Sequence, residues 1–230
     1  GTLNFNRLMS EINERLNHYY DSGKPLAHIL AIKYDNTNQE LLIFIDEGLI
    51  DQIQISGNMK TKDFILSREL EFGEGDIFLA DNAIKSLQNI YSTGLFNRVT
   101  LNVLRGDSAN TIIIRVKEKR YVLMRVGLNA SIERQANAFV EFAQDNLFGR
   151  EVKLSLMGMI GNLEKSAEFK IYSVRLFKTL LTYRFSLYYS DRLDRYFEEN
   201  TKLDDYVTIR RGVQFVLGQQ IARLGSITGE

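Results

Sequence analysis

Residue types that carry out enzyme chemistry are few in this sequence and poorly spaced for it. His18 and His28 have no third metal-binding side chain at a ligand-like spacing, so we predict no metal site. The chain has no cysteine, which excludes disulfides, thiolate zinc sites and cysteine nucleophiles. The glycine-x-serine-x-glycine signature of serine hydrolases is also absent. We therefore predict no catalytic residue, no metal and no cofactor.

Two further patterns allow both a chemical and a structural interpretation. Gly57-Asn58 precedes a predicted helix but lacks the lysine-serine pair of a phosphate-binding loop, so it is interpreted as a turn. Glu47 and Glu118 each end a predicted strand, where two carboxylates could act as acid and base. Their matching places in a repeated pattern favour a hinge between structural modules. The predicted hinge residues are Glu47, Gly48, Glu118 and Lys119.

The composition indicates a globular chain without a strongly charged partner. Lysine plus arginine equals aspartate plus glutamate at 29 each, so charge gives no reason to expect nucleic acid. No apolar run approaches the roughly 20 residues that a membrane-spanning helix needs. The chain begins with Gly1 and shows no signal peptide, so we expect its N-terminus to be a cut within a longer protein.

A helix followed by two strands is predicted for the first part of the chain. From residue 4 to residue 20, apolar side chains recur at steps of three and four, which is typical of an amphipathic helix. Gly23 and Pro25 end this helix, because glycine takes the left-handed closing conformation and proline cannot continue it. Strands are expected at 27–34 and 41–46, with a turn at 36–38.

The same order returns after Gly48 in a fuller form. A strand at 50–56 precedes helices at 61–70 and 80–93, and strands follow at 98–104 and 111–118. Thr61 is a candidate cap for the first of these helices. A βααββ unit of this kind has one sheet face covered by two helices, which is a common two-layer arrangement.

From Tyr121 onward the helical period ends and apolar residues alternate with polar ones. A sixth strand, at 206–217, places Arg211 on its apolar face, so we expect a bulge or bend at Gly212. The longer polar segment 190–205, which includes Asp191-Arg192-Leu193-Asp194-Arg195, is expected to be a solvated outer loop. Five strands with clear alternation precede the sixth, at 122–131, 136–142, 151–160, 168–171 and 181–189.

Alternation by itself leaves two interpretations open for this second half. Long antiparallel strands with one apolar face fit a soluble sheet or closed six-stranded barrel, covered on one side. They also fit a transmembrane barrel with lipid outside and a polar lumen. The strand lengths of about ten residues and the alternation of short and long links favour the transmembrane barrel.

The region from residue 53 to residue 99 resembles the polypeptide-transport-associated (POTRA) domain. This domain precedes the barrel in bacterial outer-membrane assembly and two-partner secretion translocators, which include the surface-antigen type. The segment 120–127 is similar to the entry into that barrel, and Asn146-Leu147-Phe148-Gly149-Arg150 to an early turn. The POTRA resemblance rests on 53–58 (Ile-Gln-Ile-Ser-Gly-Asn), Lys60-Thr61, Arg68-Glu69-Leu70, Gly75-Asp76, 89–96 (Asn-Ile-Tyr-Ser-Thr-Gly-Leu-Phe) and Val99.

A finer resemblance points to the branch whose barrel follows a patatin-like phospholipase domain. It rests on residues 20–27, 47–50 and 116–121. Because the hydrolase signature is absent here, such a domain would lie upstream of Gly1. One departure is that the superfamily has an arginine-glycine-aromatic motif on a late loop. Arg211-Gly212-Val213 lacks the aromatic and lies too early, and the chain encodes too few strands for a complete barrel.

These observations predict α+β POTRA modules (βααββ) followed by an antiparallel β-sheet that is part of a transmembrane β-barrel. The expected domains are a partial POTRA-like module at 1–48, a complete module at 49–119 and the first barrel strands at 120–230. The resemblance implies a Gram-negative outer membrane, with residues 1–119 in the periplasm. Such a fragment is not expected to be an enzyme.

The resemblance also implies a function in insertion, export or anchoring of polypeptide. The alternative is a POTRA domain and barrel that export or anchor a fused patatin-like lipid hydrolase. The expected partners are unfolded or partly folded polypeptide and outer-membrane lipid, with a homo-oligomer possible and no nucleic acid. POTRA sheets bind a client as an added strand, whose backbone hydrogen bonds require little sequence specificity. The candidate edge carries Asn97, Arg98, Thr100, Asn102 and Leu104, with Val99, Leu101 and Val103 facing the core. The alternative is an edge that is merely solvated or covered by a neighbouring module.

Overall fold

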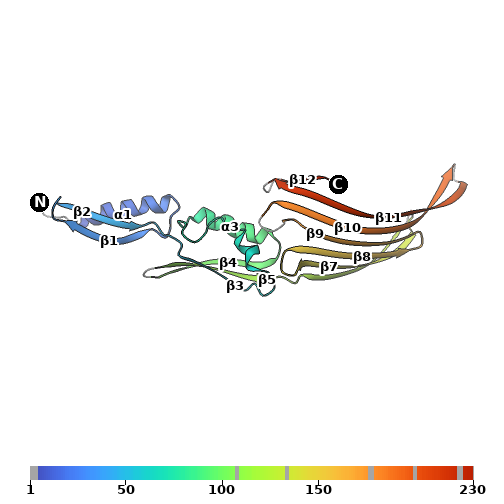
Figure 1. Ribbon diagram of the computed structural model, residues 1–230, viewed down its shortest axis with the longest axis horizontal. Helices are drawn as coiled ribbons and strands as arrows, with labels where there is room; N and C mark the ends of the chain where they lie inside the picture. Colours follow the sequence, from blue (N-terminus) through green and yellow to red (C-terminus); the bar gives the residue numbers. More distant parts are fainter. Residues whose placement is uncertain are drawn as a thin grey trace. The chain divides into compact units, whose positions relative to one another are not determined.

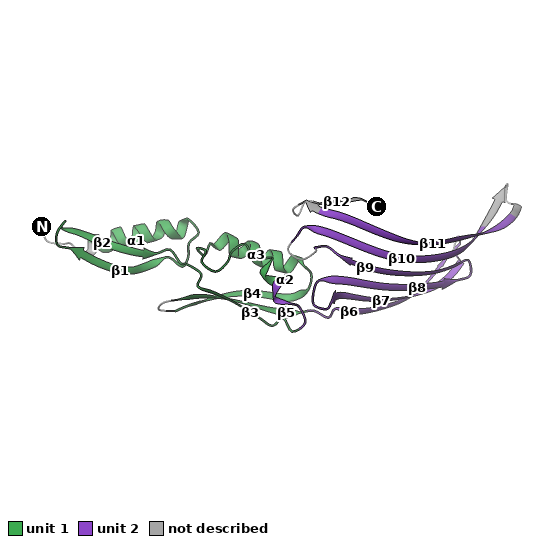
Figure 2. Ribbon diagram, in the orientation of Figure 1, with its two compact units in different colours: residues 1–59, 66–118 green, residues 60–65, 119–230 purple. Residues whose placement is uncertain are grey.

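The computed structural model divides the protein into two compact units (Figure 2). Unit 1 comprises residues 1–59 and 66–118, and unit 2 comprises residues 60–65 and 119–230. The chain therefore passes from one unit to the other three times, after residues 59, 65 and 118. The structure describes residues 5–106, 109–132, 135–175, 179–198, 201–221 and 225–229.

Unit 1 begins with an amphipathic helix and a two-stranded hairpin (Figure 1). Helix α1 spans Phe5–Asp21, and strands β1 (His28–Asp35) and β2 (Glu40–Asp46) pair antiparallel. Ile12 of the helix is buried, as expected for its apolar face. At the hairpin tip, Asp35 accepts hydrogen bonds from the Thr37 amide (2.9 Å) and the Asn38 side chain (2.9 Å). These two bonds, the first the stronger, hold the pKa of the Asp35 carboxyl below its usual value.

The second part of unit 1 is a three-stranded sheet accompanied by two helices. Strands β3 (Gln52–Ser56), β4 (Phe96–Arg105) and β5 (Asn110–Glu118) lie in the order β3-β5-β4, with β3 parallel and β4 antiparallel to β5. Helix α3 (Ala80–Ser92) lies against β4. Alternate side chains of β5 are buried because one sheet face is covered, as in other two-layer folds. The buried core includes Leu66, Ala83, Ile90, Leu95, Phe96, Ile112, Ile114 and Val116.

Helix α2 is shorter than the sequence pattern predicts. It spans Asp63–Ser67, whereas a helix over 61–70 was expected. The Lys62 amide donates a hydrogen bond of 2.9 Å to the Gly149 carbonyl, so the backbone just before α2 is bound to a distant turn. After α2, the Glu69 amide bonds the Leu66 carbonyl (3.0 Å) in a tighter turn, which does not continue the α-helix.

Unit 2 is dominated by one antiparallel sheet of seven strands in sequence order, from β6 to β12. Each strand pairs with the next along the chain, so the sheet is an up-and-down meander (Figure 1). No helix in the described part of the chain is long and apolar enough to cross a membrane. The strands are β6 (Val122–Ser131), β7 (Gln135–Leu147), β8 (Val152–Gly161), β9 (Glu164–Ser173), β10 (Leu181–Glu198), β11 (Thr201–Ile221) and β12 (Gly225–Gly229).

Two expectations for β10 and β11 are wrong. The described residues of the segment 190–205, which are 190–198 and 201–205, are not a loop. Instead, β10 and β11 continue as a paired ribbon with Asp191 opposite Ile209 and Leu193 opposite Val207. The alternating charges of this segment made it resemble a loop in the sequence. In the structure, Arg192 and Asp194 lie on the polar face of the sheet and form an ion pair with each other.

The expected bulge at Gly212 is also wrong, because pairing is continuous from Leu181 to Tyr196. Gly212 lies directly opposite Tyr188, whose ring covers the glycine: an added Cβ would lie 2.7 Å from the ring Cζ. The strand therefore accommodates the glycine without bending. Arg211 consequently stays on the apolar face, opposite Tyr189.

The register divides the seven-stranded sheet into a polar and an apolar face. Arg125 pairs with Glu141 on the polar face, where their side chains form an ion pair of 3.0 Å. The apolar face carries Met124, Phe142, Leu156, Phe169, Leu187 and Val213 in one row across six strands. Many of its side chains are solvent-exposed, with Leu128 at 88%. An exposed apolar surface of this extent marks contact with a partner or a membrane.

Candidate strand-binding edge

The candidate edge belongs to β4, which is an outer strand of the sheet in unit 1. Its residues from Phe96 to Arg105 pair with β5, and among the described strands β4 has no second neighbour. One row of backbone N–H and C=O groups on β4 therefore faces outward. Such a row is the surface to which an extended peptide can add as another strand.

The structure places the predicted site residues together along this edge. Asn97, Arg98, Thr100 and Asn102 are exposed, and Leu104 is 60% exposed. The alternate residues Val99, Leu101 and Val103 are half-buried. The side chains of an added strand would therefore lie beside a row of exposed side chains on β4. Strand binding at these residues stays a prediction.

The opposite edge of the same sheet is less open to an added strand. Strand β3 has five residues against ten in β4. The Ile53 amide of β3 donates a hydrogen bond of 3.0 Å to the Glu74 carboxylate, which occupies a backbone donor outside the sheet. Longer strands offer more backbone hydrogen bonds to an added strand. The two edges therefore differ in length and in how far their backbone groups are already bonded.

Two side-chain bonds support the far part of β4. Arg105 donates a hydrogen bond of 3.3 Å to the Pro25 carbonyl, which links the strand end to the loop after α1. Thr100 donates one of 3.4 Å to the Arg115 carbonyl on the neighbouring strand. Both use side chains, so neither occupies an outward backbone group of β4.

The first predicted hinge lies where the hairpin of β1 and β2 connects to β3. Glu47 forms an ion pair of 2.6 Å with Lys24. Gly48 has a φ of +87°, and an added Cβ would lie only 2.5 Å from the Cβ of Leu26. The Gly48 carbonyl also accepts a bond of 2.9 Å from Phe78. A glycine is needed here for close approach as well as for its backbone conformation.

The second predicted hinge lies at the division between the two compact units. Glu118 is the last residue of β5, and the boundary follows it directly, before Lys119. Lys119 forms an ion pair of 3.4 Å with Asp145, and both side chains are about one-third exposed. A partly exposed pair of this kind contributes little to stability. Motion at either hinge stays a prediction.

A buried polar cluster in unit 2 was missed by sequence reasoning, which treated Thr61 as a helix cap and as part of the POTRA resemblance. The Thr61 hydroxyl lies 2.9 Å from the Tyr121 hydroxyl and accepts a bond of 2.9 Å from the Asn146 amide. The Asn146 carbonyl oxygen accepts the Glu151 amide at 2.8 Å. All four residues are buried. Polar residues inside the turn 146–150 were the available signal, but only coordinates pair them with residue 61.

Gly149 allows this cluster to close. Its φ is +70°, and an added Cβ would lie 2.0 Å from the Lys60 carbonyl oxygen. Any side chain at 149 would therefore displace the segment that contains Thr61. The turn 146–150 and residues 60–62 form one interlocked structure within unit 2.

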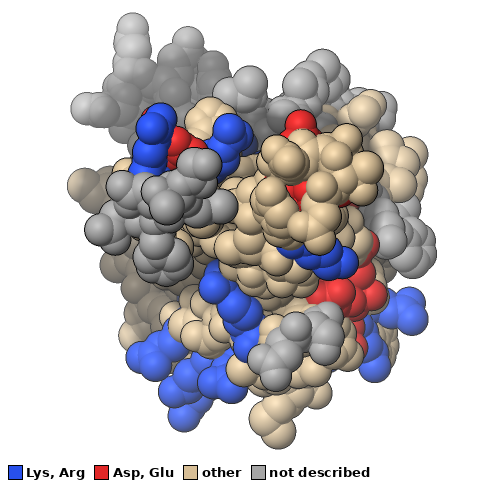
Figure 3. Space-filling view, turned by 90° about the vertical axis from the view of Figure 1, so that its left-hand side faces the viewer, with Lys and Arg blue, Asp and Glu red and all other residues tan. Residues whose placement is uncertain are grey.

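The two histidines lie on different elements of unit 1, His18 on α1 and His28 at the start of β1. Within the described residues, no group of three or more His, Asp and Glu is placed to hold a metal ion. His18 lines a surface hollow of about 480 Å³ with Glu14 and Tyr19, and His28 Nδ1 lies 3.2 Å from the Leu26 carbonyl. On the face seen in Figure 3, both signs of charge occur among uncharged residues. Lys and Arg side chains gather at the lower left of this view, and Asp and Glu side chains at its right.

Comparison with known proteins decides the class of this chain. The family model described as POTRA, surface antigen variable number repeat, matches residues 49–119. The outer membrane protein assembly factor BamA of Neorickettsia risticii is 28% identical over 192 residues, which cover 82% of this chain. This chain is an outer-membrane protein with a POTRA domain. Residues 49–119 form that POTRA domain.

Two solved structures share the fold of this POTRA protein. BamA from Haemophilus ducreyi lacking POTRA domains 1–3 has a TM-score of 0.61 at 16% identity and covers 98% of this chain. CdiB from Escherichia coli also has a TM-score of 0.61, at 14% identity and 98% coverage. The POTRA protein spans 25% of the Neorickettsia relative and 55% and 44% of these two structures. The predicted fold class, POTRA modules followed by an antiparallel sheet, is confirmed.

Proposed function

We propose that this POTRA protein acts in the insertion, export or anchoring of polypeptide at the outer membrane, and that β4 binds the client as an added strand. The observation that carries the proposal is the sheet order β3-β5-β4, which leaves the ten residues of β4 without an outer neighbour among the described strands. The likeness to outer-membrane assembly factors supports the same class of activity. The client is unfolded or partly folded polypeptide.

Backbone pairing suits a client whose sequence varies. An added strand bonds through N–H and C=O groups that every residue except proline provides, so recognition depends mainly on extended conformation. The exposed side chains of Thr100 and Asn102 adjust the contact without excluding most partners. A neutral overall charge, with 29 basic and 29 acidic residues, adds no strong preference for charged clients.

Single cysteines provide a direct test, because the native chain has none. Full-length protein carrying Asn102→Cys is mixed with an unfolded outer-membrane barrel polypeptide that contains one cysteine and has been diluted from urea. We expect a disulfide to form between the two chains, since side chains on adjacent strands lie about 5 Å apart. The yield is measured by non-reducing electrophoresis.

The matched control is Gln54→Cys on β3, an equally exposed position at the opposite edge. We expect a yield several times lower there. Adding Thr100→Lys to the Asn102→Cys variant should reduce capture, because edge lysines oppose strand addition. Equal yields at residues 102 and 54, or no effect of the lysine, would show that β4 is not the binding edge.

A second candidate function is the export or anchoring of a patatin-like lipid hydrolase fused upstream. Two of the segments that resemble that branch, 20–27 and 47–50, contact each other through the Lys24–Glu47 ion pair of 2.6 Å. This contact makes them a single structural feature of the chain. The coding sequence before Gly1 tests the idea: a serine-hydrolase domain there supports it, whereas further POTRA modules favour a general assembly factor.

A further inference from the structure

One cation lies in a row of the apolar face that is otherwise uncharged. Arg211 is on the apolar face of the seven-stranded sheet, between Ile209 and Val213 along β11 and opposite Tyr189 on β10. It is exposed and forms no hydrogen bond or ion pair with the described residues. Its neighbour Arg210 points to the polar face, opposite Ser190. The position of Arg211 is therefore unusual for a face that meets lipid.

The neighbouring row on the apolar face adds two further charges. Lys165 on β9 lies directly opposite Asp191 on β10. Together with Arg211 they make two cations and one carboxylate, so the cluster carries a net positive charge. The row on the other side of Arg211 is entirely apolar: Leu156, Phe169, Leu187 and Val213. Arg211 thus lies between an apolar row and a row that carries charges on β9 and β10.

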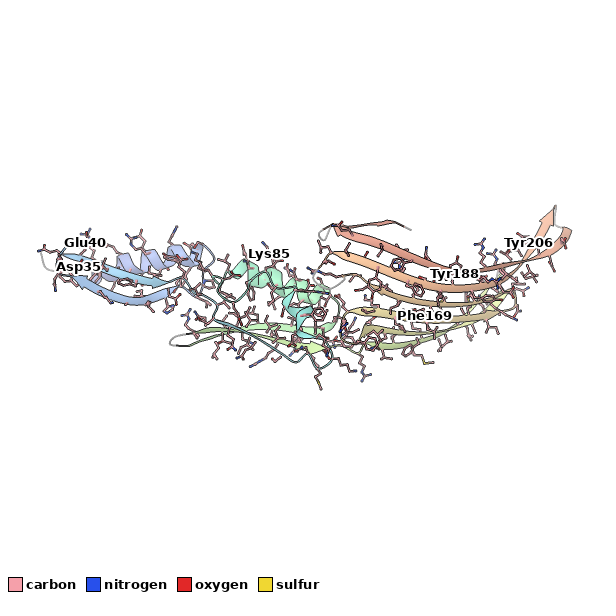
Figure 4. The ribbon with its side chains drawn as sticks, viewed as in Figure 1. Asp35, Glu40, Lys85, Phe169, Tyr188 and Tyr206 are labelled. Atoms are coloured by element: carbon pink, nitrogen blue, oxygen red, sulfur yellow. The ribbon has the colours of Figure 1, made fainter. Side chains whose placement is uncertain are left out.

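A shallow hollow of about 510 Å³ leads from the apolar band to Arg211. Ala167 forms its floor, because this small residue lies between the larger Phe169 and Tyr189 side chains of the lining. Phe169, on β9, is labelled in Figure 4. The lining residues are mainly apolar apart from Arg211 and Glu168. The Glu168 side chain belongs to the polar face by register and forms an ion pair of 2.8 Å with Lys170. A ligand that fits has an extended hydrocarbon part and a negatively charged head.

Depth in the membrane supports the same assignment. A charged side chain on the lipid face of a barrel is strongly unfavourable at the bilayer centre and nearly neutral close to the interface. From Leu181 to Tyr189, the eight steps between nine residues rise about 26 Å along β10. In a strand tilted by about 40°, this covers roughly 20 Å of an apolar band about 25 Å tall. Arg211 lies opposite Tyr189, in the outer part of that band, and Ile209 and Val207 continue the apolar face beyond it. From this position a long arginine side chain can extend its charged end to the lipid headgroups.

We propose that Arg211 and the hollow beside it bind an anionic phospholipid, with the acyl chain over Ala167 and the headgroup phosphate at the guanidinium. Arginine suits phosphate because its planar donors can bond two oxygens at once. A second protein chain would need an apolar surface and negative charge in matching places. An anionic phospholipid carries an apolar acyl chain and a negatively charged headgroup in one molecule. The proposal rests on the outer-membrane location and not on strand capture by β4.

The test uses the full-length protein in nanodiscs that mix phosphatidylcholine and phosphatidylglycerol in equal parts. Native mass spectrometry counts the phosphatidylglycerol molecules that remain bound after release. We expect Arg211→Gln to reduce bound phosphatidylglycerol about fivefold, which is the typical effect of one cation at an anionic surface. Arg210→Gln removes the same charge from the polar face and should leave the count unchanged.

Two further variants separate lipid binding from loss of folding. Ala167→Phe fills the hollow while keeping every charge, and we expect it to lower the count as well. Arg211→Lys keeps the charge and should retain most of the binding, which covers the case in which Arg211→Gln fails to insert. Equal losses in Arg210→Gln and Arg211→Gln, or a loss that follows dissociation of a dimer, would overturn the proposal. The β4 crosslinking yield is measured separately and does not depend on these outcomes.

Discussion

The two sheets of this protein use the same alternating sequence pattern for opposite purposes. In the sheet of unit 1, alternate residues of β5 are fully buried, and Ile112 and Ile114 are 0% exposed. In the sheet of unit 2, the apolar residues of β6 are exposed, and Leu128 reaches 88%. The difference is the environment of the apolar face. Helices cover it in unit 1, whereas lipid takes that place for a membrane sheet.

Burial of polar residues reverses in the same way. The described core of unit 1 is mainly aliphatic and aromatic, as in water-soluble domains. In unit 2 the buried residues include Asn137 and Ser186, both on the polar face of the sheet. A membrane barrel keeps its polar groups inside, where they bond one another or water in the lumen. The comparison shows that alternation of apolar and polar residues along a strand indicates a sheet with two different faces. The burial of the side chains then indicates which of these faces meets solvent.

The largest effect is expected from a cavity in unit 1. Ile112→Ala should lower the free energy of unfolding of unit 1 by about 2–5 kcal/mol, because it removes three buried carbons where nothing can easily collapse. Hydrogen exchange of the β4 and β5 amides in the full-length protein measures it. The control Leu104→Ala, at a 60% exposed position, should change stability by under about 0.5 kcal/mol. Similar losses for both would mean that the helices do not enclose this sheet face.

A matched pair on β6 tests the lipid-facing side of unit 2. Met124 is 69% exposed on the apolar face and Leu123 is 48% exposed on the polar face. Met124→Arg should destabilise the membrane-inserted protein by about 2–4 kcal/mol, since it places a charge in hydrocarbon, whereas Leu123→Arg should cost under about 1 kcal/mol. Urea unfolding from phosphatidylcholine vesicles measures both. A larger loss for Leu123→Arg would reverse the assignment of the two faces.

A smaller effect is expected from the buried polar cluster. Asn146→Ala leaves the Glu151 amide without its acceptor and removes the donor to Thr61. We expect unit 2 to lose about 1–3 kcal/mol, the cost of an unsatisfied buried group. Asn129→Ala on β6 is the control, because that side chain is exposed. Vesicle unfolding compares the two, and equal stability of both variants would show that the cluster contributes nothing.

Elements with a strong periodic pattern were predicted well. The helix at 80–93 and the strands at 98–104 and 111–118 correspond to α3, β4 and β5, because apolar spacing there matches burial. The segment 190–205 was misjudged, since its alternating charges resemble a loop although its backbone continues β10 and β11. A strand tolerates charged residues on a face that contacts water. A prediction based on the hydrophobic pattern does not recognise such a charged segment as a strand.

The candidate site also has features that the sequence predicts and features that only the structure shows. Asn97 to Leu104 could be proposed from sequence because the strand alternates and the family resemblance names its edge. That β4 lies outermost, and that Glu74 bonds the amide on the competing edge, depends on which strands become neighbours. Arg211 could be placed on the apolar face from alternation, but continuous pairing through Gly212 keeps it there.

Local periodicity and turn residues therefore determined by themselves that this chain has helix-covered modules followed by long two-sided strands, because spacing along the backbone dictates which side chains share a face. Tertiary structure alone decided strand order, the contact of residues 60–62 with the turn 146–150, and the hollow that ends at Arg211. Those features join residues far apart in sequence. Their pairing depends on three-dimensional packing, which no spacing within a single segment encodes.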